Sequence, residues 1–274
     1  MSNGRSRHEW DLRVPTADEL KAFMVPTGIA FAEATSGPEL DDWARLQEPD
    51  RWLGAFEGPQ SSDPIGAAAA LSRRLTVPGG EIPAAAITAV GVRPDHTRRG
   101  VLTALMRRQL DDIHAARESV AILWASEGAI YQRFGYGLAT FDGGFEAAAA
   151  RTAFTRQLAA EGRVRLVTEA ESRDLFPPIY EVMRTSTPGA ITRPPDWWNI
   201  GLLADPEYSR EGMSEKYRVV YEADGQPEGY AIYRVKQDWD ALGPKGVLQV
   251  RDVVAVTARA QRAIWRYLFD IDLV

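Results

Sequence analysis

Apolar and polar positions follow one another in blocks through the middle of the first half of the chain. An apolar run from Ile87 to Val92 ends at Arg93-Pro94 and is followed by a polar turn. A second apolar run covers 120–125, and between the two runs apolar residues recur with the spacing of a helix: Leu102, Leu105, Met106, Leu110 and Ile113. The pattern predicts a strand, a turn, a helix and a second strand within 86–137, and we take this unit as the one around which the chain is organised.

The turn before the predicted helix carries Arg98, Arg99 and Gly100, a combination that favours an anion. A helix N-terminus presents unpaired N–H groups and the positive end of the helix dipole, so arginines there are unfavourable unless a negative group lies between. Glycine lets a ligand come close to the backbone. A phosphate or diphosphate satisfies both requirements. The alternative is a solvated arginine pair.

The blocks around this unit predict a first domain over residues 1–146. Up to the polar turn we expect a strand at 12–14, a helix opened by the capping box Thr16–Glu19 and ending near Val25, and a helix from Gly37-Pro38. Three strands follow, at 51–56, 65–77 and 82–92. The last two strands are expected to pair as a hairpin around Pro78-Gly79-Gly80. Strands joined by a parallel crossover and flanked by helices predict an α/β (α+β) fold with a mixed central sheet.

The second half repeats the order of elements and predicts a second domain over 164–274, after a connector at 147–163. A strand end and a connecting helix are expected within 141–163. Beyond it the pattern predicts a helix through 175–183, a helix from Pro194-Pro195, a hairpin around Asp224-Gly225, a strand at 247–256 and a helix capped by Thr257 that runs to about Phe269. The turn 256–261 has no glycine, so this domain is not expected to bind the anion.

Composition narrows the classes of partner and chemistry. The chain has 274 residues and a formal net charge of −6, which disfavours nucleic acid and anionic membranes as partners. It has no cysteine, which excludes disulfides, thiolate nucleophiles and cysteine-bound zinc, and its three scattered histidines make a metal site unexpected. We therefore expect no metal. No signal-peptide core or membrane-length apolar run is present, so we expect a cytoplasmic protein.

Two motifs carry a resemblance to a known family. The segment VRPDHTRRGVLTAL resembles the acyl-CoA signature Q/R-x-x-G-x-G/A of the GNAT N-acetyltransferases, with Thr97 at its first position and Leu102 at its second small position. The segment ASEGAIYQRFGYGLAT is more specific, and together the two resemble the Eis (enhanced intracellular survival) family, whose members also carry that leucine. The similarity continues in PGAITRPPDWW, GYAIYRVK and LFDIDLV. It implies the GNAT fold followed by a second GNAT-like domain without a CoA signature.

The resemblance implies acetyl-CoA as co-substrate and assigns its contacts. These fall on the backbone of the first strand, on the turn and on the segment after the second strand: Val90, Gly91, Val92, Arg98, Arg99, Gly100, Val101, Leu102, Thr103, Ser126 and Glu127. Without the family resemblance, the pattern at Val90, Gly91 and Val92 indicates only buried residues of a strand. Ser126-Glu127-Gly128 then reads as a turn or a helix N-cap.

By the same resemblance, Tyr131 is the general acid that protonates the leaving thiolate. A phenol keeps its proton at neutral pH, because its reference pKa is near 10. The alternative is an aromatic packing residue. Tyr136 is the main rival for the role, whereas Phe134 has no proton to give.

The acceptor implied by the resemblance is a primary amine, on an aminoglycoside or a lysine side chain. Glu33 and Trp43 align with positions that line the family's acceptor pocket, where a carboxylate and an aromatic face suit a cation. A surface glutamate and a core tryptophan are the alternatives. The resemblance also implies a homo-oligomer, a hexamer.

The source of the general base stays open: the chain is either a piece of a longer protein, and then lacks the base, or a natural truncation. In the family it is the terminal carboxylate of a third, sterol-carrier-like domain, and this chain stops at Val274. Two other functions stay open: a GNAT acyltransferase with a non-antibiotic amine acceptor, and a non-catalytic acyl-CoA-binding or assembly module.

Overall fold

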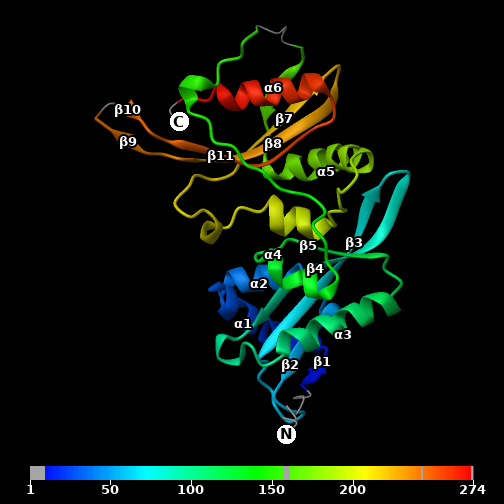
Figure 1. Ribbon diagram of the computed structural model, residues 1–274. Coiled ribbons are helices and arrows are strands. Elements are labelled where there is room, and N and C mark those ends of the chain that lie inside the picture. The colour runs from blue at the N-terminus through cyan, green and yellow to red at the C-terminus, as the bar shows by residue number, and fades with distance from the viewer. Residues whose placement is uncertain (1–9, 157–160, 242, 273) are drawn as a thin grey trace. The chain divides into compact units, whose positions relative to one another are not determined.

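The computed structural model describes residues 10–156, 161–241, 243–272 and 274. Their contacts divide the chain into two compact units, Met1–Thr140 and Phe141–Val274 (Figure 1). The described part of 141–163 contains only the 3₁₀ turn η5, Ala149–Arg151, before strand β6 begins at Arg163, so the strand end and connecting helix expected there are wrong for these residues. Residues 157–160 of that stretch lie outside the described residues. The boundaries drawn from the sequence at 146 and 164 stay a prediction.

A mixed five-stranded sheet forms the centre of the first unit, in the order β1-β2-β3-β4-β5. Its strands are β1 Asp11–Arg13, β2 Trp52–Phe56, β3 Gly66–Val77, β4 Gly80–Val92 and β5 Val120–Leu123. Neighbours are antiparallel except β4 and β5, which run parallel because a helix connects them. The predicted mixed sheet and the β3–β4 hairpin are both confirmed.

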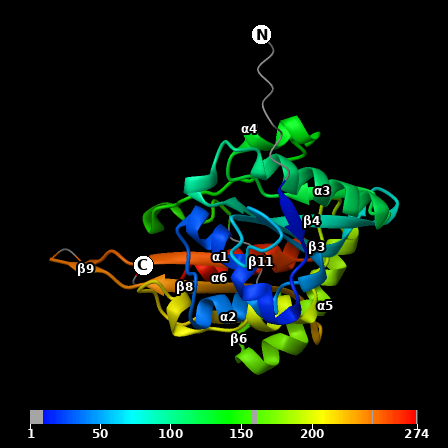
Figure 2. The same ribbon diagram turned by 90° about the horizontal axis from the view of Figure 1, so that it is seen from below.

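Helices cover both faces of this sheet. They are α1 Leu20–Phe31, α2 Pro38–Arg45, α3 Val101–Ala115 and the short α4 Gly128–Tyr131, with 3₁₀ turns η1 Ala17–Glu19, η2 Pro49–Arg51, η3 Pro94–His96 and η4 Gln132–Phe134. Figure 2 shows α1 and α3 on opposite sides of β3 and β4. The alanines of β3 allow both helices to pack closely. Ala67 and Ala69 belong to a core cluster that includes buried residues of α1, and Ala68 belongs to one that includes buried residues of α3.

Helix α1 does not end near Val25 as the sequence suggested. It continues through Pro26 to Phe31, and Pro26 is buried within it. Proline costs one main-chain hydrogen bond, but the helix buries Phe23 and Met24 against the sheet, and this packing outweighs the local break. The extension matters because the last turn of α1 reaches the end of β4.

A bulge divides β4 into two parts. The register shifts opposite Ala67–Ala69, and Ala89 has a positive φ of 50°, which is uncommon for a residue with a side chain. The parallel pairing with β5 ends at Ile87 and Leu123. The last residues of β4 therefore have no β5 partner on their outer side.

The second unit is built on a four-stranded sheet in the order β11-β8-β7-β6. Its main elements are β6 Arg163–Leu166, α5 Glu169–Ser186, β7 Tyr217–Ala223, β8 Gln226–Lys236, β11 Val247–Ala255 and α6 Ala258–Phe269. A π-helix η6 Trp197–Leu202, a 3₁₀ turn η7 Glu207–Ser209 and a small ribbon of β9 Trp239–Asp240 with β10 Gly243–Pro244 complete it.

Helices α5 and α6 pack on opposite faces of this second sheet, below and above its strands in Figure 1. The order of strands matches β1 to β4 of the first unit, and the last strand again leads into a helix. The predicted hairpin around Asp224-Gly225 and the Thr257 cap are confirmed.

We predict that Gly91→Ala destabilises the first unit. A Cβ added at Gly91 would lie 2.9 Å from Thr27 Cα and 3.2 Å from Ala30 Cβ, so α1 would have to move away from β4. Overpacking of this kind costs about 1–3 kcal/mol, measurable by urea denaturation. Gly58→Ala is the control, because no atom of the described residues lies within 4 Å of its added Cβ; equal stability of the two variants would contradict the close packing.

Candidate active site

A groove of about 520 Å³ opens in the first unit where β4 parts from β5. Its walls come from the end of α1, the end of β4, the start of α3, and α4 with the turn that follows it. Every residue predicted from the sequence to contact the cofactor lines this groove, apart from Arg99. Segments from three places in the chain thus meet at one site.

Other residues of the groove were missed by sequence reasoning: Ala30, Phe31, His96, Thr97, Ile130 and Arg133. Ala30 and Phe31 were missed because α1 was expected to end before them. Ile130 and Arg133 flank Tyr131 within one helical turn, and that spacing could have indicated them.

The start of α3 is open to a ligand. Its N-cap is Gly100, with φ 90° and ψ 0°, a conformation that favours glycine, and no side chain there accepts a hydrogen bond from the first turn. Arg98, just before it, has a positive φ of 61°. Arg98 has no carboxylate partner among the described residues, so positive charge accumulates where the helix dipole is already positive.

Arg99 points elsewhere. Its guanidinium donates to Glu57 at 3.2 Å and lies 5.1 Å from the centre of the Trp10 ring. The two arginines that the sequence placed together are thus separated. One faces the groove, and the other is held by a carboxylate and an aromatic ring.

The corresponding helix start in the second unit is closed. The Thr257 hydroxyl accepts from the Ala260 N–H at 3.1 Å and donates to the Glu228 carboxylate at 2.7 Å. Arg259 also binds Glu228, with its Nε at 2.8 Å. The chain's own side chains supply both the cap and the negative charge there. Helix α3 has no side-chain cap, and its first turn contains no acidic residue.

Two tyrosines near the groove differ in their surroundings. Tyr131 lines the groove and is partly exposed; burial, and then the charge of Glu127, raise its pKa. Tyr136 packs its ring edge to face with Tyr131, with centroids 5.8 Å apart, and lies against a core cluster that contains Ile87 and Ile113. Its hydroxyl is buried with no hydrogen-bond partner in the described part of the chain, and burial raises its pKa to about 12.

The predicted acceptor residues lie outside the groove lining. Glu33 follows α1 and is exposed, with its backbone N–H bonded to the Gly28 carbonyl at 2.8 Å. Trp43, in α2, packs on the core cluster that contains Phe23 and Trp52.

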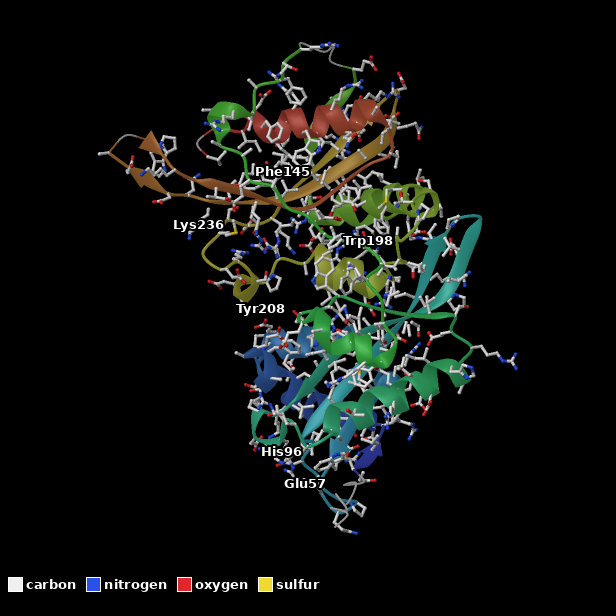
Figure 3. All side chains as sticks on the ribbon, viewed as in Figure 1. Glu57, His96, Phe145, Trp198, Tyr208 and Lys236 are labelled. Carbon is white, nitrogen blue, oxygen red and sulfur yellow. The ribbon has the colours of Figure 1, made fainter. Side chains whose placement is uncertain are left out.

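His96, at the edge of the groove, lies between two carboxylates. Its Nε2 is 3.2 Å from Glu57, and both residues are labelled in Figure 3. Its Nδ1 is 3.0 Å from Asp95. The neighbouring imidazole of His96, followed by the guanidinium of Arg93, lowers the pKa of Asp95 to about 2. These contacts hold turn η3 next to the start of α3.

Comparison with known proteins agrees with this arrangement. Models of the acetyltransferase (GNAT) domain match residues 11–139 and again residues 189–274. The chain therefore contains two acetyltransferase (GNAT) domains. It is 43% identical, over 96% of its length, to an uncharacterised N-acetyltransferase of Streptomyces avermitilis, and 33% identical, over 94%, to N-acetyltransferase Eis of Mycobacterium tuberculosis.

Solved structures give the same result. The crystal structure of Eis1 from Mycobacterium abscessus matches 96% of this GNAT chain with a TM-score of 0.74 and 34% identity. The match covers 64% of that structure, and this chain likewise spans 64% and 63% of the two relatives named above. The predicted Eis resemblance and the second GNAT domain are therefore confirmed.

Two further observations concern the described residues alone. None of their helices has both the length and the apolar character to cross a bilayer. No group of three or more histidine, aspartate or glutamate side chains among them is placed to hold a metal ion.

We predict that Asp95 titrates near pH 2 in a carboxyl NMR titration, below its reference value of about 3.9. A lowered carboxyl pKa stabilises the folded state above the unfolded value, and this contribution is lost as pH falls through the folded pKa. His96→Ala should raise the pKa of Asp95, and also that of Glu57, which His96 lowers. Glu171 of the second unit, whose pKa is lowered by the hydrogen bonds from Thr168, serves as the unaffected control; an unchanged pKa of Asp95 in the variant would exclude the contact.

Proposed function

We propose that the protein is an acetyl-CoA-dependent N-acetyltransferase that acts on primary amines. The observation that carries the proposal is the groove between β4 and β5 beside an uncapped helix start. GNAT domains imply use of acetyl-CoA, and the named relatives are N-acetyltransferases. The groove supplies two kinds of group that such a ligand requires: free strand backbone and a positively charged anion site.

The residues present fit the co-substrate. The first N–H groups of α3 and the guanidinium of Arg98 would hold the diphosphate. The backbone of Val90, Gly91 and Val92, which β5 leaves unpaired, would hold the pantetheine amides as an added strand. Ser126 and Glu127, which also line the groove, would complete the contacts.

Acetyl-CoA supplies the acetyl group as a thioester, from which the amine displaces a thiol. In our proposal Tyr131 is the general acid, and its hydroxyl holds the proton that the leaving sulfur takes up. Its raised pKa keeps this proton in place at neutral pH. Tyr131 lines the groove while Tyr136 faces the core, and this supports the choice between them.

The proposed acceptor is an aminoglycoside-like amine or a lysine side chain. Phe31 lines the groove, and Glu33 follows it by two residues in the sequence. In our proposal the exposed carboxylate of Glu33 attracts a cationic acceptor to the groove. Trp43 is the weaker candidate, because it packs on the core. By resemblance to the Eis proteins we also propose that the protein is cytoplasmic and forms a hexamer. Light scattering, which gives the mass of the oligomer, tests the hexamer.

The acceptor is tested by thiol release from acetyl-CoA with kanamycin, a lysine-containing peptide and a small polyamine. We expect release with at least one of them and saturable acetyl-CoA binding by calorimetry. Release only with amines unrelated to antibiotics would favour the wider acyltransferase function. Binding without release for any amine would favour an acyl-CoA-binding module.

We predict that Tyr131→Phe lowers kcat by roughly 100-fold or more, the usual contribution of a general acid, while acetyl-CoA affinity is retained. Tyr136→Phe is the matched control. It removes a buried hydroxyl that has no partner among the described residues, so turnover should persist and stability should stay equal or rise. Thiol-release kinetics and thermal unfolding measure the two effects, and unchanged turnover in Tyr131→Phe would remove Tyr131 from the mechanism.

A further inference from the structure

The arginines around the groove fall into two classes. Arg93 and Arg99, which neighbour lining residues in the sequence but do not line the groove, each bind a carboxylate. Arg98 and Arg133 line the groove, and within the described residues neither has a carboxylate partner. Unpaired guanidinium groups that face a groove are typical of sites where the ligand brings the negative charge.

Arg133 comes from a different wall than Arg98. It lies in turn η4, directly after α4, whereas Arg98 precedes α3. Its side chain is exposed and packs over the ring of Phe134, 5.0 Å from its centre, a contact that limits its rotamers. The anion-binding capacity of the groove is therefore divided between two walls.

Coenzyme A carries negative charge in two separate places, the diphosphate and the 3′-phosphate of the ribose. The start of α3 and Arg98 account for the diphosphate. His96 also lines the groove, but it already lies between Glu57 and Asp95. Arg133 is thus the cation left for the second anionic group.

We propose that Arg133 binds the 3′-phosphate and makes the groove selective for coenzyme A over its 3′-dephospho form. The inference rests on the proposed function. It adds a specificity-determining residue to it, on the wall that also carries Tyr131. A guanidinium suits this task because it presents a planar fork of donors to phosphate oxygens.

The test is a calorimetric titration of the protein with coenzyme A and with 3′-dephospho-coenzyme A. The wild type should bind coenzyme A about tenfold more tightly, as expected for one charge-assisted contact. Arg133→Ala should bind both ligands with the affinity that the wild type has for the dephospho form. Arg133→Lys should keep part of the preference, because it keeps the charge but loses the fork.

Arg107→Ala is the matched control, since Arg107 is an exposed arginine of α3 outside the groove lining, and it should keep the full preference. Equal binding of both ligands by the wild type overturns the inference and leaves the proposed function standing. An equal loss for both ligands in Arg133→Ala also overturns it, because the contact would then be to the diphosphate. If the wild type binds neither ligand, the proposed function itself fails.

Discussion

The parting of β4 from β5 is the constraint on which the candidate site depends. Were the two strands paired over their full length, the outward N–H and C=O groups of Val90 and Val92 would be used within the sheet. The bulge at Ala89 and the end of pairing at Ile87 leave these groups free. Buried backbone groups require partners, so the fold itself creates a need that an extended ligand can meet. The open start of α3 lies beside this gap.

A comparison of the two GNAT domains shows which features they share, the bulged strand that leads into a helix, and which feature differs, the start of that helix. The fourth strand of the second domain, β11, also has a register shift, between Val250 and Asp252, and also leads into a helix. The difference lies at the helix start, where Thr257 caps α6 and Glu228 provides a negative charge. The same topology thus produces a helix start without a side-chain cap in one copy and a capped helix start in the other. The deciding change is at the cap residue, Gly100 against Thr257.

Most of the fold could be predicted from the sequence because its signals are local. Apolar runs, the Pro-Gly-Gly turn and capping residues indicated the strands, the hairpin and the helix starts. The length of α1 could not be predicted, because burial of Phe23 and Met24 carries the helix past Pro26. The direction of Arg99 could not be predicted either, since it depends on Glu57, a residue far away in the sequence.

The separation of Tyr131 from Tyr136 shows what the fold adds to a motif. Both lie in the same glycine- and aromatic-rich segment, and burial raises the pKa of each, so neither residue type nor acidity distinguishes them. Position does: the helix–turn pair α4 and η4 places one ring in the groove and the other against the core, with the two in edge-to-face contact. The ring of Tyr136 is partly buried and packs against the ring that lines the groove. A proton donor must reach the reacting atoms as well as hold a proton, and the position of Tyr131 in the groove is what supports our proposal that it is the general acid.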